Sequence, residues 1–204
     1  MKLNAKELRD VDEKEIQEKL KDIKRRPIYF ILENIYDTYN IGGLFRLADA
    51  LAITKMYICG ESEIPPNGRI KKASIGTYKV VPWEYKKTAA EAIKSFKDES
   101  ALIFPQVNSL EINTGSNIHS RQNSTSSSRP KVYAIEQHKT SIPYTEAEYT
   151  FPVALILGNE TSGVTEETLK LADKIVEIPM WGINKSLNVI VSAAIVSYHV
   201  AAKI

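Results

Sequence analysis

Two short apolar runs near the C-terminal end constrain the fold of this chain more than any other feature. Residues 154–158 read ALILG and residues 174–179 read KIVEIP. Runs of this length that end at Gly or Pro are typical of buried β-strands. Between them, Thr165 can cap a helix whose first turn holds two glutamates, where the helix dipole favours negative charge. The pattern predicts a strand–helix–strand unit.

The loops after these two strands carry glycines together with polar side chains. Glycine lets a backbone approach a ligand closely, and in open α/β sheets ligands bind outside the carboxyl ends of the strands. We therefore expect a ligand pocket here, although each glycine by itself could simply serve a tight turn. A last helix follows, with Ser186 as its expected N-cap. The residues concerned are Gly158, Asn159, Glu160, Gly163, Gly182, Asn184, Ser186 and Asn188.

The rest of the chain alternates between strand and helix patterns. Residues 28–32 (IYFIL) are bulky and β-prone throughout, which indicates a strand buried on both faces. Five or six such strands predict an α/β fold with an open, mainly parallel sheet flanked by helices. We expect further strands at 55–59, 78–83 and 131–137, a possible one at 101–107, and helices at 44–51, 88–96 and 187–202.

Two segments depart from this alternation. Residues 5–24 carry a rough helical stripe of apolar side chains among charges, so residues 1–26 are expected to form an amphipathic helical extension. Of residues 113–128, twelve are Asn, Ser, Thr or Gly, which cannot bury enough apolar surface to offset the cost of ordering the backbone. We expect a flexible insert at about 108–130 in an otherwise single domain, 1–204.

Composition excludes several classes of protein. The chain has 204 residues, enough for one core, and its apolar runs are shorter than the roughly 20 residues of a membrane span. The charged N-terminus lacks the apolar centre of a signal peptide. We expect a cytoplasmic protein without membrane contact. Cys59, the one cysteine, ends an apolar run and is expected to be buried and inert, and the three histidines stand too far apart for metal-ligand spacing, so no metal is expected.

Charge is unevenly distributed along the chain. Residues 1–97 hold 19 Lys and Arg against 14 Asp and Glu, whereas residues 98–204 hold 8 against 11. The first half is therefore the better candidate to face the phosphates of a nucleic acid, with ordinary surface charge as the alternative. The basic residues singled out as phosphate contacts are Arg25, Arg26, Arg46, Arg69, Lys71 and Lys72, each of which could instead be simply solvated.

Three motifs occur together in this chain. They are NIYDTYNIGGLFRLADA at 34–50, GNETSG at 158–163 and IPMWGINKSLNV at 178–189. In order and spacing the sequence resembles the SpoU/TrmH-type branch of the SPOUT superfamily, RNA ribose 2′-O-methyltransferases. The resemblance covers about residues 27–107 and 131–204 and breaks at the polar insert.

The resemblance implies a fold with a deep C-terminal trefoil knot and S-adenosylmethionine as the cofactor. It implies transfer of a methyl group to a ribose 2′-hydroxyl of tRNA or rRNA. On the helix expected at 44–51, Arg46 lies nearly opposite the apolar stripe. By resemblance, Arg46 activates the ribose hydroxyl, either by losing a proton with help from an RNA phosphate or as an electrostatic guide. Catalytic positions implied by the family are Asn40, Arg46, Glu160, Ser186 and Asn188. Cofactor positions are Ile135, Gly158, Asn159, Glu160, Gly163, Ile178, Met180, Ser186 and Leu187.

The last helix is apolar on nearly every face, whereas a surface helix would show a polar side. We therefore expect a homodimer through this helix, in agreement with the dimers of the family. The alternative function is a non-catalytic RNA-binding or ribosome-assembly protein on a methyltransferase scaffold. A nucleotide enzyme of the Rossmann type is disfavoured, because no G-x-G-x-x-G follows the strand at 28–32.

Overall fold

One seven-stranded sheet organises the structure, a computed structural model that describes residues 2–12, 16, 18, 20–105 and 129–204. The strand order is β3-β2-β1-β6-β4-β7-β5, and the neighbouring strands of this sheet pair in parallel. This confirms the expected parallel α/β sheet, although the described residues form seven strands where five or six were expected. The strands are β1 (Arg26–Glu33), β2 (Ile53–Cys59), β3 (Trp83–Lys86), β4 (Lys131–Ile135), β5 (Ile142–Pro143), β6 (Val153–Leu157) and β7 (Lys174–Glu177).

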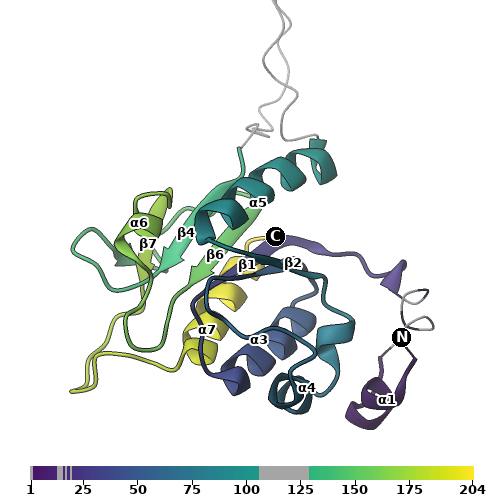
Figure 1. Cartoon of the computed structure of the whole chain (residues 1–204). Helices are drawn as coiled ribbons and strands as arrows, with labels where there is room; N and C mark the ends of the chain where they lie inside the picture. Colours follow the sequence, from purple (N-terminus) through teal and green to yellow (C-terminus); the bar gives the residue numbers. More distant parts are fainter. Residues whose placement is uncertain (1, 13–15, 17, 19, 106–128) are drawn as a thin grey trace, which may run out of the picture.

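Helices cover both faces of the sheet (Figure 1). Helices α3, α4 and α7 share one apolar core with β1 and β6, and α5 and α6 share a second core on the opposite face. The helices are α1 (Ala5–Asp10), α3 (Thr38–Ala50), α4 (Gly68–Ser74), α5 (Ala89–Ile103), α6 (Glu166–Leu169) and α7 (Val189–Ala201), with a 3-10 turn η1 at Thr77–Lys79.

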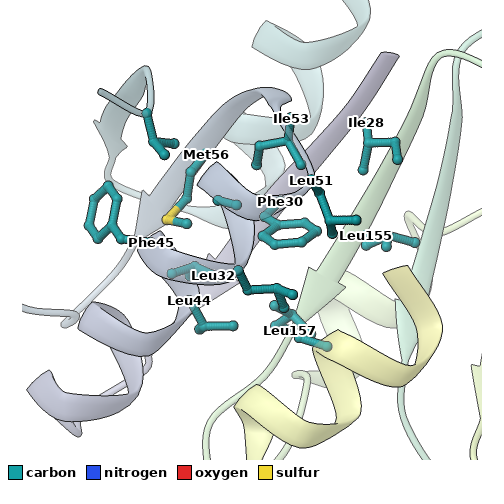
Figure 2. Packing of buried hydrophobic residues seen from close by; sticks show 14 of the residues in the cluster. Ile28, Phe30, Leu32, Leu44, Phe45, Leu51, Ile53, Met56, Leu155 and Leu157 are labelled. Carbon is teal, nitrogen blue, oxygen red and sulfur yellow. The ribbon is translucent and has the colours of Figure 1, made fainter. Parts of the chain in front are cut away.

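Strand β1 lies in the centre of the sheet and contributes side chains to both cores. Phe30 points to the side of α3 and α7, where Figure 2 shows it beside Leu51 and Leu155, whereas Tyr29 and Ile31 belong to the core under α5. All of them are fully buried. The uniformly apolar run at 28–32 is thus explained by burial on two faces.

Two strand predictions were wrong, because the described residues at these positions form other elements. Thr77 begins the turn η1, and its carbonyl accepts the amides of Val80 and Val81 at 3.0 Å, so strand β3 starts later, at Trp83 opposite Met56. The turn is set by Gly76, whose φ of 92° reverses the chain. The possible strand at 101–107 instead supplies the last turn of α5 as far as Ile103.

The cap expected for the last helix was also misplaced. Asn188, two residues beyond Ser186, is the N-cap of α7, because its side-chain oxygen accepts the amide of Ile190 at 2.8 Å. At α5, by contrast, the expected cap Thr88 is confirmed, accepting from the amide of Glu91 at 3.2 Å.

The N-terminal extension is helical at residues 5–10 and at the described residues 16, 18 and 20, with a break at residues 11–12. Helix α1 starts at a capping box of Asn4 and Glu7 and ends at Asp10, before the extended C-cap residue Val11. Residues 23–25 are also outside helices. Ile16 is 2% exposed and joins the core beneath α3, so the extension lies on the domain. Most of the predicted insert, residues 108–128, lies outside the described residues.

Candidate functional site

A cavity of about 350 Å³ opens where β4, β6 and β7 end. Its walls are the segments that follow these three strands and the first turn of α7. Since parallel strands present their carboxyl ends at one edge, the topology brings these distant segments together. Every residue expected to hold the cofactor lies in the lining: Ile135, Gly158, Asn159, Glu160, Gly163, Ile178, Met180, Ser186 and Leu187.

The loop after β6 closes tightly on itself. Asn159 and Gly163 exchange backbone hydrogen bonds of 3.1 and 2.9 Å. A Cβ at Gly158 would lie 2.3 Å from the carbonyl carbon of Gly163 and from the amide nitrogen of Val164. At this position the tight-turn explanation therefore applies, because the chain itself needs the space before any ligand does.

Asn159 holds this loop from inside. The side chain is buried, and its oxygen accepts the amides of Thr161 at 2.8 Å and Ser162 at 2.9 Å. The amide nitrogen of the same side chain donates to the carbonyl oxygen of Asn34 at 2.8 Å. The loop after β6 is thereby fastened to the loop after β1.

Glu160 joins the cavity to the first motif. Its carboxylate accepts the side-chain amide of Asn40 at 2.9 Å and the backbone amides of Tyr36 and Asp37 at 3.4 and 3.3 Å. Asn40 in turn accepts from the side-chain amide of Asn188 at 3.0 Å. Three residues from the three motifs thus form one hydrogen-bonded chain, and Glu160 and Ser186 also line the cavity.

Arg46 stands apart from this chain of contacts. It lies on α3, exposed, on the side away from the buried stripe of Leu44, Leu47 and Ala48, as its helical position predicts. Arg46 is not among the described residues that line the cavity. The helix nevertheless carries Asn40 six positions earlier, which is in direct contact with Glu160.

The six candidate RNA contacts fall into two groups. Arg25 donates to the carbonyl oxygens of Val80 at 2.6 Å and Ile53 at 3.4 Å, and burial lowers the pKa of its guanidinium. Arg26 is exposed, but it donates to the carbonyl oxygen of Ala201 at 3.0 Å. These two hold the chain together around β1. The others are exposed and free to meet solvent: Arg46, Arg69, Lys71 and Lys72.

Glu136 and Lys185 line the cavity but were missed from the sequence. The carboxylate of Glu136 accepts the amides of Val164 and Gln137, both at 2.9 Å, and so ties the loop after β6 to the end of β4. Gly163, with a φ of 70°, leaves room for this carboxylate, since a Cβ there would lie 2.2 Å from Oε2. The sequence pattern placed Glu136 inside the strand expected at 131–137, whereas β4 ends at Ile135 and Glu136 is the first residue after it.

Within the described ranges, no group of three His, Cys, Asp or Glu side chains could hold a metal ion. The expectation of a metal-free site remains a prediction. Across the same residues, the helices are too short or too polar to cross a membrane.

A family profile described as the SpoU rRNA methylase family matches residues 27–110 and 106–198. The chain belongs to this family. The matched residues include Asn40, Glu160 and Asn188. The hydrogen bonds that link the three motifs therefore lie within the part of the protein that matches the family profile.

Named relatives of this SpoU-family chain are RNA methyltransferases. A tRNA (guanosine(18)-2′-O)-methyltransferase of Thermus thermophilus is 26% identical over 180 residues, which are 86% of this chain and 75% of the relative. The Escherichia coli protein of the same name is 23% identical over 86% of this chain and 64% of its own.

Solved structures of the family share the fold. The Aquifex aeolicus TrmH/SpoU tRNA modifying enzyme has a TM-score of 0.68 at 22% identity, covering 94% of this chain and 83% of that one. AviRb from Streptomyces viridochromogenes, solved in complex with AdoMet, has a TM-score of 0.69 at 19% identity, covering 89% of this chain and 59% of that one.

Proposed function

We propose that this chain is an S-adenosylmethionine-dependent methyltransferase that transfers a methyl group to a ribose 2′-hydroxyl of tRNA or rRNA. The observation that carries the proposal is the chain of contacts from Glu160 through Asn40 to Asn188 at the edge of the cavity. It unites the three motifs of a family whose named relatives are RNA 2′-O-methyltransferases.

The cavity fits S-adenosylmethionine in size and chemistry. Its volume of about 350 Å³ is within the range of small-molecule sites, which is roughly 300–1,000 Å³. Apolar side chains such as Ile135, Ile178 and Leu187 suit a flat adenine, while Glu136 and the backbone at Gly158 offer polar groups for the ribose and the amino acid part. When bound, this cofactor would supply a methyl group on a positively charged sulfur.

The residues of the chain would contribute mainly positioning. Attack by a ribose hydroxyl requires the oxygen in line with the methyl group, and a fixed geometry supplies much of the acceleration. Asn40 and the two backbone amides hold the Glu160 carboxylate in one orientation. We infer that this carboxylate and Ser186 shape the place where hydroxyl and methyl group meet.

Arg46 would act on the hydroxyl as an electrostatic guide. The guanidinium of Arg46 is exposed, and because a guanidinium donates hydrogen bonds but accepts none, it is a poor general base. A fixed positive charge beside the attacking oxygen stabilises the alkoxide character that develops in the transition state. The exposed cluster Arg69, Lys71 and Lys72 on α4 would contact the same RNA.

The active form proposed here is a homodimer through α7. One side of this helix packs on the sheet through Ala193, Val196 and Val200, but Val191 and Tyr198 are 44% and 54% exposed. Next to them in the chain, the preceding loop exposes Trp181 and Ile183 almost completely. Apolar surface of this extent is typical of a protein–protein interface, and a second copy of the chain would cover it.

A C-terminal trefoil knot is also proposed for this domain. Strand β6 lies between β1 and β4, and the chain that leaves β7 returns to α3 through the contact of Asn188 with Asn40. Stretching the protein by its two ends tests this, because a knotted chain would reach a shorter final length than an unknotted chain of the same sequence length. We further propose that residues 1–204 form one domain, located in the cytoplasm with its RNA substrates.

Incubation of the purified protein with labelled methyl donor and unfractionated RNA from a strain lacking the gene tests the function. Label should appear in 2′-O-methylated nucleosides. A protein that binds RNA but neither binds nor consumes S-adenosylmethionine would instead support the non-catalytic scaffold.

A further inference from the structure

A second hollow, of about 510 Å³, lies beside the first motif. It adjoins the candidate site because Glu160, in the lining of the cavity, accepts the backbone amides of Tyr36 and Asp37. Tyr36 also borders the hollow, so a group bound there would lie next to the proposed reacting centre. The lining is Tyr36, Thr38, Glu63, Asn67, Gly68 and Arg69.

Tyr36 offers a flat surface at the rim of this hollow. Its side chain is 55% exposed, and its hydroxyl donates to Glu61 Oε2 at 3.0 Å, which fixes the ring at its far end. An exposed aromatic ring held in this way is a platform on which a nucleobase can stack.

Glu63 and Arg69 give the hollow a specific polarity. Asn67 connects them, since its amide nitrogen donates to Glu63 Oε2 at 3.5 Å and its oxygen accepts the backbone amide of Arg69 at 2.9 Å. An ionised carboxylate can only accept hydrogen bonds, and a guanidinium can only donate them. The base that fits must present donors to Glu63 and acceptors to Arg69.

Guanine meets this requirement better than the other bases. Its N1–H and N2–H groups are adjacent donors that can pair with both oxygens of one carboxylate. Its O6 and N7 atoms are adjacent acceptors, the usual partners of an arginine. In adenine, cytosine and uracil, a donor on the pairing edge stands next to an acceptor, so Glu63 could satisfy one contact at most.

We propose that this hollow receives the guanine base of the target nucleotide, with Glu63 as the residue that selects it. The proposal rests on the proposed methyltransferase function and names its substrate as a guanosine. Tyr36 stacks on the base, and the attached ribose extends past residues 36 and 37 toward Glu160.

Binding can be tested without methyl transfer. Guanosine 5′-monophosphate at millimolar concentration is added to the isotope-labelled protein, with adenosine 5′-monophosphate as the comparison. The amide signals of Tyr36, Gly68 and Arg69 should shift with the guanine nucleotide, and the shifts should fall at least about tenfold in Glu63→Gln. Equal responses to both nucleotides, or none to either, would overturn the proposal.

Methyl transfer supplies the second test. Wild type should form 2′-O-methylguanosine, and Glu63→Gln and Tyr36→Ala should lower its rate at least about tenfold at unchanged cofactor affinity. Tyr36→Phe keeps the ring but loses the hydrogen bond to Glu61 that fixes it, so its rate should lie between those of wild type and Tyr36→Ala. The exposed Glu146→Gln is the matched carboxylate control. Methylation of another nucleoside, or variants as active as wild type, contradicts the guanine site. Guanine-selective binding without any methyl transfer would instead refute the proposed function and leave the guanine site standing.

Discussion

Asn188 donates from its side-chain amide to the side-chain oxygen of Asn40 at 3.0 Å, although 148 positions separate them. The same Asn188 side chain caps α7 through its oxygen. One residue therefore both caps the last helix and holds it against the first motif. Asn40 in turn donates its side-chain amide to the carboxylate of Glu160.

Replacement of Asn188 by Ser separates these two roles. Serine is as good an N-cap as asparagine, so the helix should keep its start and the melting temperature should change little. The amide that reaches Asn40 is lost, which should lower kcat about tenfold or more. Asn188→Ala, without either contact, should cost about 1–2 kcal/mol of stability in addition. A serine variant with full kcat would show that the contact has no part in catalysis.

Arg46→Ala should abolish methyl transfer, lowering kcat about 100-fold or more, since a fixed charge at a transition state is worth that much. Affinity for S-adenosylmethionine should stay within a few fold, because Arg46 lies outside the cavity lining in the described chain. Calorimetry and the methylation assay measure both quantities. Lys94→Ala, an exposed cation on α5, is the control, and the catalytic role is excluded if Arg46→Ala is as active as this control.

Val191→Glu should raise the dissociation constant of the dimer at least about tenfold, because it places a charge in an apolar interface. Val191 is 44% exposed within one chain, so the fold should survive, whereas the fully buried Val196 would be an unsuitable choice. Light scattering across a dilution series reports the change. Leu102→Glu is a matched control, an apolar residue 81% exposed on α5. A wild type that is monomeric at micromolar concentration would refute the dimer.

Glu33→Leu should destabilise the protein by about 2–3 kcal/mol, since buried donors would lose their acceptor. The carboxylate of Glu33 is buried at the end of β1 and accepts from the amide and hydroxyl of Thr165 at 2.9 and 3.0 Å and from the hydroxyl of Thr168 at 2.5 Å. Glu33→Gln keeps one acceptor and should cost less. Urea denaturation compares the variants, and equal stabilities would show that the contact contributes nothing net.

Cys59 should resist thiol reagents at pH 8 in the folded protein and react fully once unfolded. Burial, with Glu33 nearby, raises the pKa of this thiol to about 12, so very little reactive thiolate is present. Because the folded pKa exceeds the unfolded value of about 8.5, this group's contribution to stability is complete below pH 8.5 and declines as pH rises toward 12. Rapid labelling of the native protein would contradict the prediction.

Local sequence patterns determined the elements that bury apolar surface. The run at 28–32 predicted a central strand, and the stripe on α3 predicted an exposed Arg46, because periodicity reports directly which side chains face a core. The second and third motifs likewise contain most of the residues that line the cavity, although their spacing in the chain says nothing of their distance in space.

Contacts between distant segments were decided by tertiary structure alone. The insertion of β6 between β1 and β4 brings Glu160 to Asn40, and no local pattern encodes that strand order. Arg25, expected to face RNA, donates instead to carbonyl oxygens of Val80 and Ile53, which only the folded chain places within reach. The physical reason is that strand order and hydrogen-bond partners depend on non-local packing, whereas hydrophobic periodicity records only burial.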